Sequence, residues 1–253
     1  MPIDTASFLG KVREQLDRIE ATQAGAIDRA ADLIAAALAE DGVLQVFGTG
    51  HSEALAMELV GRAGGLIPTN KLALRDLVIL GGESAETLAD PKAERDPALA
   101  RRVWDLAPIG PHDPVVIASQ SGGNGSTVEM ARIARENGHP LIAVTSREHS
   151  ERIVSRHPSG KRLFELADVV IDNAAPYGDA VLDLPGGGTV CGVSSIGNAV
   201  IAQLLVAAVT ARLIAADADA EPPIYLSANI AEGDAHNDVW EARYAGRIRR
   251  SAY

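Results

Sequence analysis

Two short segments of this chain combine glycines with hydroxyl side chains, each directly after an apolar run. The first is Gly48-Thr49-Gly50-His51-Ser52, after the run Val43–Phe47. The second is Ser119-Gln120-Ser121-Gly122-Gly123-Asn124-Gly125-Ser126, after Pro114–Ala118. Glycines let the backbone approach a ligand closely, and hydroxyls and unpaired amides donate hydrogen bonds to anionic oxygens. Both segments therefore indicate an anion-binding turn between a strand and a helix.

The first segment could also be compared with a dinucleotide-binding turn. The third glycine of the G-x-G-x-x-G pattern is replaced here by Glu53. A carboxylate would repel a pyrophosphate at that point, and the chain has no Walker A loop. We therefore expect no cofactor.

The second segment is the more specific of the two. Ser126 and Glu129 have the spacing of a capping box, which predicts a helix beginning at Ser126 and leaves the earlier part of the loop free for a ligand. The alternative is a polar connection shaped only by the needs of the turn. The predicted anion-binding residues are Ser119, Ser121, Gly122, Asn124 and Ser126, with Gly48, Thr49, Gly50 and Ser52 of the first segment.

The elements that must position these turns follow from the hydrophobic spacing. Apolar residues between Asp4 and Glu40 recur mostly every three, four, or seven to eight positions, which predicts one long helix or two joined near Gly25. Apolar runs then alternate with helical patterns, as in a mostly parallel sheet flanked by helices. We expect an α/β protein with a single three-layer domain. Its predicted parts are a helical segment at 1–40, a core at 41–216 and a tail at 217–253, with a helix at Asn237–Ile248.

Composition narrows the possible partners. The formal net charge of −11 argues against nucleic-acid binding, which needs clustered basic residues. The apolar stretch Ile196–Ala216 carries Asn198, Gln203 and Arg212, so we interpret it as a buried helix and expect no membrane contact. No secretory signal is evident, and the single cysteine, Cys191, fits a reducing compartment; we expect a cytoplasmic protein.

The long N-terminal helix predicts that the chain forms an oligomer. Its apolar stripe is larger than one sheet face can cover, so we expect part of it to face another subunit in a homodimer or homotetramer. The alternative is that it packs entirely across its own core.

These motifs resemble the SIS (sugar isomerase) family, in which a Ser-x-Ser-Gly-x-Thr-x-Glu loop between a strand and a helix binds the phosphate of a sugar phosphate. Ser119, Ser121 and Gly122 fit that loop, Asn124 replaces the threonine, and the stretch before Glu129 is longer. Nearly the whole chain is similar to the UPF0309 group of bacterial SIS proteins, related to phosphoheptose isomerase. The stretches that carry this similarity are 119–130, 155–162, 167–173, 227–229 and 236–237. The resemblance implies the SIS fold and a phosphosugar ligand.

The resemblance also implies residues for proton transfer. An aldose–ketose isomerase that forms an enediol needs a base beside C1 and C2. Glu58-Leu59-Val60-Gly61-Arg62 is similar to the Glu-Leu-Thr-Gly-Arg stretch of phosphoheptose isomerase, whose glutamate is catalytic, so Glu58 is the predicted base. The residues equally allow a simple ion pair between Glu58 and Arg62.

Two histidines complete the predicted catalytic set. His51 follows the first glycine turn, and His236 lies in the tail; in related isomerases a histidine from a neighbouring subunit assists ring opening. Either could instead be an exposed polar or capping residue. His149, after a strand end, is a further residue that could line the site.

A metal is not expected. Phosphoheptose isomerase can carry zinc held by His, Glu, Gln and His, but Ala54 stands where the first histidine would be. The late helix has Asn198 and Gln203 and no histidine.

The leading hypothesis is an aldose–ketose isomerase acting on a sugar phosphate. Two alternatives remain: a non-catalytic phosphosugar sensor, and a sugar-phosphate lyase or deaminase on the same scaffold.

Overall fold

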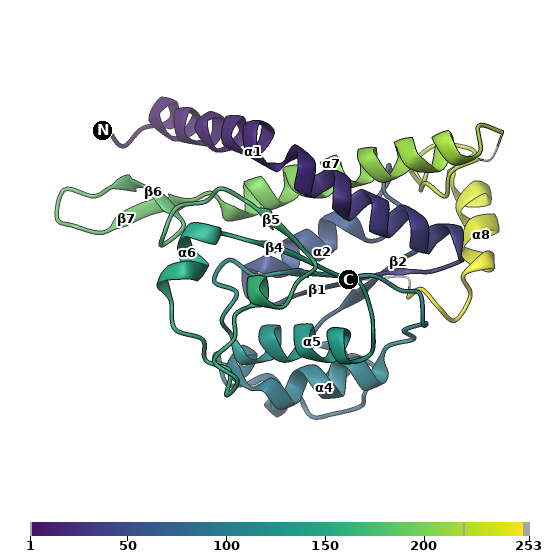
Figure 1. Ribbon diagram of the computed structural model, residues 1–253, viewed down its shortest axis with the longest axis horizontal. Helices are drawn as coiled ribbons and strands as arrows, with labels where there is room; N and C mark the ends of the chain where they lie inside the picture. The colour runs from purple at the N-terminus through teal and green to yellow at the C-terminus, as the bar shows by residue number, and fades with distance from the viewer. Residues whose placement is uncertain (1, 220, 250–253) are drawn as a thin grey trace.

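The central element is a parallel sheet in the order β2-β1-β3-β4-β5 (Figure 1). The computed structural model describes residues 2–219 and 221–249; the rest of the predicted N-terminal segment and tail (1, 220 and 250–253) lies outside the described residues. The strands of this sheet are β1 (Leu44–Gly48), β2 (Thr69–Leu72), β3 (Val115–Ala118), β4 (Leu141–Thr145) and β5 (Val169–Asp172). The predicted α/β fold with a mostly parallel sheet is confirmed.

Helices cover both faces of the sheet. The α-helices are α1 (Thr5–Ala39), α2 (Glu53–Leu59), α3 (Asp76–Ile79), α4 (Pro97–Leu106), α5 (Gly125–Glu136), α6 (Arg147–Arg152), α7 (Ser194–Ala216) and α8 (Gly233–Arg243). Short 3₁₀ turns are η1 (Gly50–Ser52), η2 (Ala85–Leu88), η3 (Ala93–Arg95) and η4 (Leu163–Glu165). One core cluster lies between the sheet and α1, α2 and α7, and a second lies between the sheet and α4 and α5.

Strand alternation assigns side chains to these two layers. Along β3, Val116 and Ala118 belong to the cluster under α1, α2 and α7, whereas Val115 and Ile117 belong to the cluster over α4 and α5. Successive strand side chains point to opposite faces, and here both faces are buried, so the run reads as continuously apolar.

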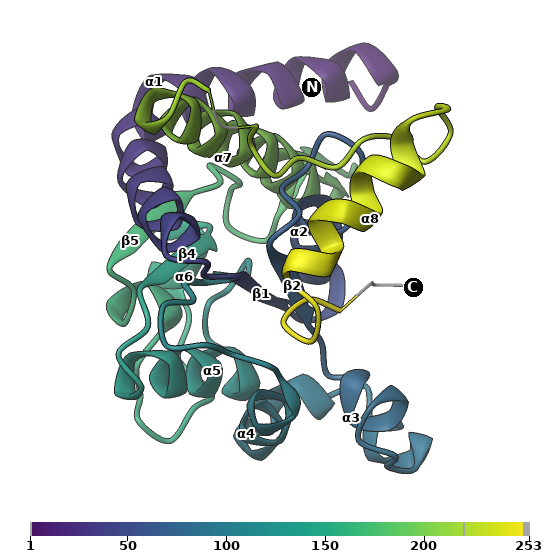
Figure 2. The same ribbon diagram turned by 90° about the vertical axis from the view of Figure 1, so that its right-hand side faces the viewer.

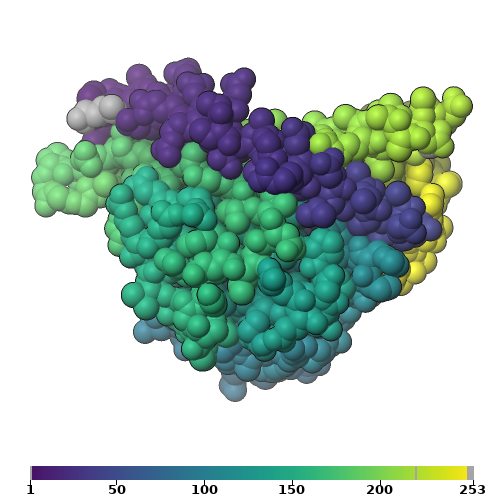
Figure 3. Space-filling model, viewed as in Figure 1, coloured from purple at the N-terminus to yellow at the C-terminus, as the bar shows by residue number. Residues whose placement is uncertain are grey.

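The first helix is continuous. Asp4 caps it by accepting a hydrogen bond from the amide of Ser7 at 2.7 Å, and it runs to Ala39 without a break at Gly25. It lies alongside α7 over the sheet (Figures 1 and 3), and Arg212 of α7 pairs with Asp28 and Asp32 of α1. Of the two arrangements that the spacing allowed, the single helix is the one that forms.

The predicted capping box at Ser126 and Glu129 is wrong. Helix α5 begins at Gly125, and the Ser126 hydroxyl donates to the carbonyl of Glu94 at 2.7 Å. Glu129 accepts from Arg132 at 2.9 Å and lies 3.0 Å from Nε2 of His157. The hydrogen bond from Arg132, with that from His157, lowers the pKa of Glu129. A tertiary contact with the 93–95 segment therefore replaces the local cap.

The hairpin of β6 (Ala180–Asp183) and β7 (Thr189–Gly192) was not foreseen from the sequence. It extends away from the sheet at the end of the molecule near the N-terminus (Figure 1). Its turn contains Gly187 and Gly188, both with positive φ, which is the usual signal for a tight connection. Cys191, on β7, is partly exposed.

The tail packs beside β2, near the end of the sheet shown in Figure 2. Leu66 and Ile224 form an antiparallel bridge. Helix α8 ends at Arg243, about five residues before the predicted end at Ile248, and Gly246 beyond it has a positive φ. Arg247 donates to the fully buried carboxylate of Asp113 at 2.7 Å. The tail is therefore fixed to the edge of the sheet where the strands begin.

Helix α7 is buried on one side only. By length and composition it could cross a membrane, but 28% of its most apolar window is already buried against this chain. It packs against α1 and α2, whereas Leu204 and Ile214 are exposed. The expected buried helix thus keeps an apolar outer face.

Candidate active site

The two glycine-rich turns meet at one edge of the sheet. β1 and β3 are adjacent parallel strands, and their register places Gly48 opposite Ala118, so both turns leave the sheet side by side. The chain continues from these strands in opposite directions across the sheet, and such switch points are where open α/β sheets bind ligands.

A carboxylate bridges the two turns. Glu94, in η3, accepts from the Thr49 hydroxyl at 2.8 Å through one oxygen and from the Asn124 amide at 2.8 Å through the other. One donor belongs to the first turn and the other to the second. Anionic oxygens therefore already occupy hydrogen-bonding positions between the turns that we predicted to bind phosphate.

Two of the glycines are needed for this close packing. A Cβ at Gly125 would overlap the carbonyl of Arg95, and a Cβ at Gly48 would lie 2.5 Å from the carbonyl oxygen of Ser52. Gly48 thus permits the tight turn into α2, while Gly125 lets the 93–95 segment lie against the start of α5.

The second turn is folded around its own serines. The Ser119 hydroxyl accepts from the amide of Gly122 at 3.1 Å, and the Ser121 hydroxyl accepts from the amide of Gly123 at 3.4 Å. Gly122 has a φ of 63°, a conformation that favours glycine. These bonds fix the loop geometry and leave each hydroxyl proton available to a ligand.

Asn124 is the N-cap residue of α5, but its side chain does not cap the helix. Its oxygen instead accepts from the exposed guanidinium of Arg156 at 3.0 Å. Neither the cation of Arg156 nor the carboxylate of Glu94 carried a sequence signal, because each comes from a distant part of the chain.

A cavity of about 340 Å³ opens beside the first turn. Its charged lining residues are Glu53, Arg75, Asp90 and Glu94. Glu53 forms ion pairs with Arg75 and with the buried Lys71, whose Nζ lies 3.4 Å away. The charge of Glu53 is therefore already balanced, while Glu94 keeps this end of the cavity acidic.

Glu58 lies on the side of α2 that faces α7. It is paired with Arg62, one turn later, and accepts from the amide of Gln203 at 2.7 Å. The ion pair that we weighed as an alternative is present, and a second partner from α7 accompanies it.

The histidines are scattered. His51 is exposed within η1, directly at the first turn. His236 lies on α8, with Nε2 2.9 Å from the carbonyl of Ile224 and Nδ1 3.5 Å from Glu221. Within one protomer, the structure therefore brings His51, but not His236, to the two turns.

His149 is held by local contacts. Its Nδ1 accepts from the amide of Gly178 at 3.1 Å, and its ring stacks on Tyr177 with centroids 5.0 Å apart. Burial lowers the pKa of His149, which disfavours the charged form of the ring.

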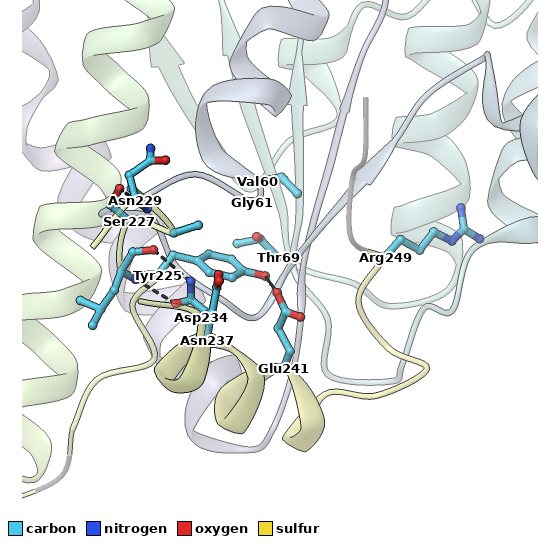
Figure 4. A pocket seen from close by; sticks show the side chains of 13 residues that line it. Val60, Gly61, Thr69, Tyr225, Ser227, Asn229, Asp234, Asn237, Glu241 and Arg249 are labelled. Atoms are coloured by element: carbon cyan, nitrogen blue, oxygen red, sulfur yellow. Dashed lines mark hydrogen bonds between the residues drawn. The ribbon is translucent and has the colours of Figure 1, made fainter. Parts of the chain in front are cut away.

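A larger cavity, of about 530 Å³, lies between the tail and the end of α2 (Figure 4). Tyr225 donates to Glu241 at 3.0 Å, and Asn237 bonds to both backbone groups of Leu226, at 2.9 and 3.0 Å. The cavity is lined in part by Thr69, the first residue of β2. It therefore lies towards the edge of the sheet where the strands begin, opposite the glycine turns. Its polar groups are largely engaged with one another.

The residues do not fit the zinc set expected from phosphoheptose isomerase. Glu58 and Gln203 are in contact, but Ala54 offers no donor atom. Across 2–219 and 221–249, no group of three or more His, Cys, Asp or Glu side chains is arranged to hold a metal.

Comparison with known proteins assigns the family. The family model described as SIS domain matches residues 7–146, more than half of the chain. The chain belongs to the SIS family. It is 38% identical over 245 residues to a UPF0309 protein of Listeria monocytogenes, covering 96% of this chain and 97% of that relative. A UPF0309 protein of Brucella canis gives the same identity and coverage. The resemblance that the motifs suggested is confirmed.

Solved structures show the same SIS fold. Phosphoheptose isomerase of Neisseria gonorrhoeae is 18% identical with a TM-score of 0.54, covering 81% of this chain and 96% of that one. Phosphoheptose isomerase of Francisella tularensis is 15% identical with a TM-score of 0.54, covering 81% and 95%.

We predict that Glu94→Gln strengthens the binding of inorganic phosphate. The carboxylate competes with an anion for Thr49 and Asn124 and repels it, whereas the amide removes the charge and keeps the shape. Glu86→Gln, an exposed carboxylate in η2, is the matched control for net charge. Calorimetric titration with phosphate should show a gain of about three- to tenfold for Glu94→Gln only. Equal or weaker binding would mean that the anion does not use these donors.

Proposed function

We propose that this SIS protein binds a sugar phosphate between its two glycine-rich turns and interconverts aldose and ketose forms by proton transfer. The observation that carries the proposal is the Glu94 carboxylate, held by Thr49 from one turn and by Asn124 from the other. A phosphate group offers the same kind of oxygens, with more charge. In the ligand-bound protein, phosphate replaces this carboxylate.

The phosphate is held locally, because the chain as a whole is acidic. Helix α5 directs its N-terminal amides towards the second turn, and its N-cap side chain leaves them uncapped. The hydroxyls of Ser119 and Ser121 and the guanidinium of Arg156 lie at the same loop. Together they supply donors and one positive charge at the point where the phosphate needs them.

Proton transfer is assigned to Glu58. In the open-chain aldose, its carboxylate takes the proton from C2 to give an enediolate with the charge on O1. The hydroxyl proton then moves from O2 to O1, and the carboxylic acid returns its proton to C1 to give the ketose. Glu58 lies about 7.5 Å further along α2 than Glu53, at the helical rise per residue. Arg62 forms an ion pair with this carboxylate, and the amide of Gln203 donates a hydrogen bond that fixes its orientation. His51, at the first turn, is the residue of this protomer placed to assist ring opening.

A second copy of the chain completes the proposal. The groove between α1 and α7, about 610 Å³, is lined mainly by apolar side chains, among them Leu16, Ile27 and Leu204. Another protomer covering this face would bury it and could supply His236, which lies away from the turns of its own chain. The proposal includes a cytoplasmic location, which the free thiol of Cys191 supports.

We expect phosphorylated sugars, and not their unphosphorylated counterparts, to raise the melting temperature. A ligand that binds only the folded state stabilises it by mass action. Ser121→Ala removes one hydroxyl of the second turn and should reduce the shift. Differential scanning fluorimetry with hexose, heptose, pentose and N-acetylhexosamine phosphates tests this. Equal shifts with neutral sugars would eliminate phosphate recognition.

Glu58→Gln should abolish most turnover while leaving ligand affinity nearly unchanged. The substitution keeps the shape but removes the base, whose contribution is about 10² to 10⁴ in rate. Exchange of the C2 proton of the bound sugar phosphate, followed by NMR, measures the step directly. Glu86→Gln, which changes an exposed carboxylate in η2, is the control. Near wild-type exchange in Glu58→Gln would assign the base elsewhere, and binding without any exchange in the wild type would favour a sensor.

We predict a homodimer or a larger assembly at micromolar concentration. The apolar side of α7 is exposed in one protomer, and a second protomer would bury it. Leu204→Glu should place a charge in this interface and shift the measured mass towards that of the monomer. Light scattering coupled to size-exclusion chromatography measures both. A monomeric wild type would remove the shared interface and the role of His236 with it.

A further inference from the structure

Amide side chains from four distant segments are linked by hydrogen bonds beneath the second glycine turn. Nε2 of Gln15, on α1, donates to the backbone carbonyl of Asn173 at 2.8 Å. Nδ2 of Asn173 donates to Oε1 of Gln120 at 2.9 Å and to Oδ1 of Asn198 at 3.0 Å. Gln15 is 4% exposed and Asn173 is fully buried. Gln120 lies inside the turn, between Ser119 and Ser121.

The neighbouring backbone fixes which way each amide points. Oδ1 of Asn173 accepts from the amide of Ala175 at 3.1 Å, so its Nδ2 must be the atom that faces Gln120. Gln120 must then present its oxygen to Asn173 and its Nε2 away from it. Gln15 must likewise present Nε2 to a carbonyl, because an oxygen there would face another oxygen. The orientation of Gln120 is therefore set by Asn173.

The remaining amide donor of Gln120 has no partner in the described part of the chain. Nε2 of Gln120 is buried and has no acceptor among the residues that the structure describes. Buried amide donors are normally satisfied, because leaving one unpaired is costly. A loop residue with one end fixed and the other unpaired has the pattern of a ligand-binding group.

The direction of the side chain indicates which part of a ligand it meets. Val116 and Ala118 of β3 face the layer of α1, α2 and α7. Gln120 continues this alternation and contacts Asn173, which also bonds to Asn198 of α7. The contact between Glu58 and Gln203 joins α2 and α7 on the same side of the sheet. Gln120 therefore lies on the side of the proposed base.

The contact at Gln15 is built closely. A Cβ at Gly197, on α7, would lie 2.5 Å from Nε2 of Gln15 and 3.0 Å from the carbonyl oxygen of Asn173. Glycine is unfavourable inside a helix, so its presence here is explained by the space that the Gln15 amide needs. Helix α7 thus has a glycine at the point where the side chain of Gln15 on α1 contacts the residue after β5.

We propose that Gln15 is a positioning residue of the ligand site: through Asn173 it holds the amide of Gln120 so that Nε2 donates to an oxygen of the sugar portion of the ligand. This inference rests on the proposed sugar-phosphate function and adds a specificity contact to it. The N-terminal helix, which itself lies outside the glycine turns, thereby helps to select a sugar phosphate over phosphate alone.

The test uses Gln15→Met and Gln120→Met, alone and together, with Gln23→Met as the matched control. Gln23 lies on the same helix and accepts from the amide of Asp172 at 2.9 Å, so it ties α1 to β5 without reaching Gln120. Affinities for the sugar phosphate that gives the largest thermal shift and for inorganic phosphate are measured by calorimetry. Gln15→Met and Gln120→Met should each weaken sugar-phosphate binding about three- to tenfold and leave phosphate binding unchanged, as expected for one hydrogen bond. Gln23→Met should leave both unchanged.

The double variant separates positioning from general damage to the fold. If Gln15 acts through Gln120, Gln15→Met has no further effect in the Gln120→Met protein. Additive losses, equal losses for both ligands, or an unaffected Gln15→Met would overturn the inference. Should Gln15→Met fail to fold, Gly197→Ala perturbs the same contact from α7, and unchanged sugar-phosphate affinity there would also overturn it. A wild type that binds no sugar phosphate instead rejects the proposed function.

Discussion

The parallel pairing of β1 with β3 is the constraint on which the rest of the site depends. Its register aligns Gly48 with Ala118, so two loops separated by some seventy residues of sequence leave the sheet at the same point. The connections then diverge across the sheet, which keeps the space above the strand ends free of helix. An anion placed there meets donors from both loops, and Glu94 already uses one from each.

The two faces of the sheet carry different groups of the candidate site. On one side, the start of α5 and the 93–95 segment lie in contact at the second turn, where the proposed anion would bind. On the other side, α2 and α7 hold Glu58 and Gln203 together, and the buried amides under Gln120 face the same layer. A single ligand that spans the switch point would therefore contact anion-binding groups at one end and a carboxylate at the other, as proton transfer on a sugar phosphate requires.

Charge explains why the anion-binding groups are so local. With a net charge of −11, the protein has no general attraction for anions, and the cations near the turns are few and mostly paired. Binding then depends on oriented amides and hydroxyls, which act only over short distances. It therefore depends also on the geometry of the two loops. The carboxylate of Glu94 illustrates this dependence on geometry, because it accepts one hydrogen bond from each turn.

The sequence by itself determined the alternation of strands and helices, the position of the two glycine–hydroxyl turns after strands, and the family, because periodicity and glycine–hydroxyl motifs are local signals. It also identified Glu58 together with its possible partner Arg62, since that pair is one helical turn apart. Only the tertiary structure brought in Glu94 and Arg156 and showed that Gln203 contacts Glu58. It also replaced the predicted cap at Ser126 with a contact to the 93–95 segment. Each of these contacts joins segments far apart in the chain, and their approach is fixed by strand order and helix packing, which no local pattern encodes.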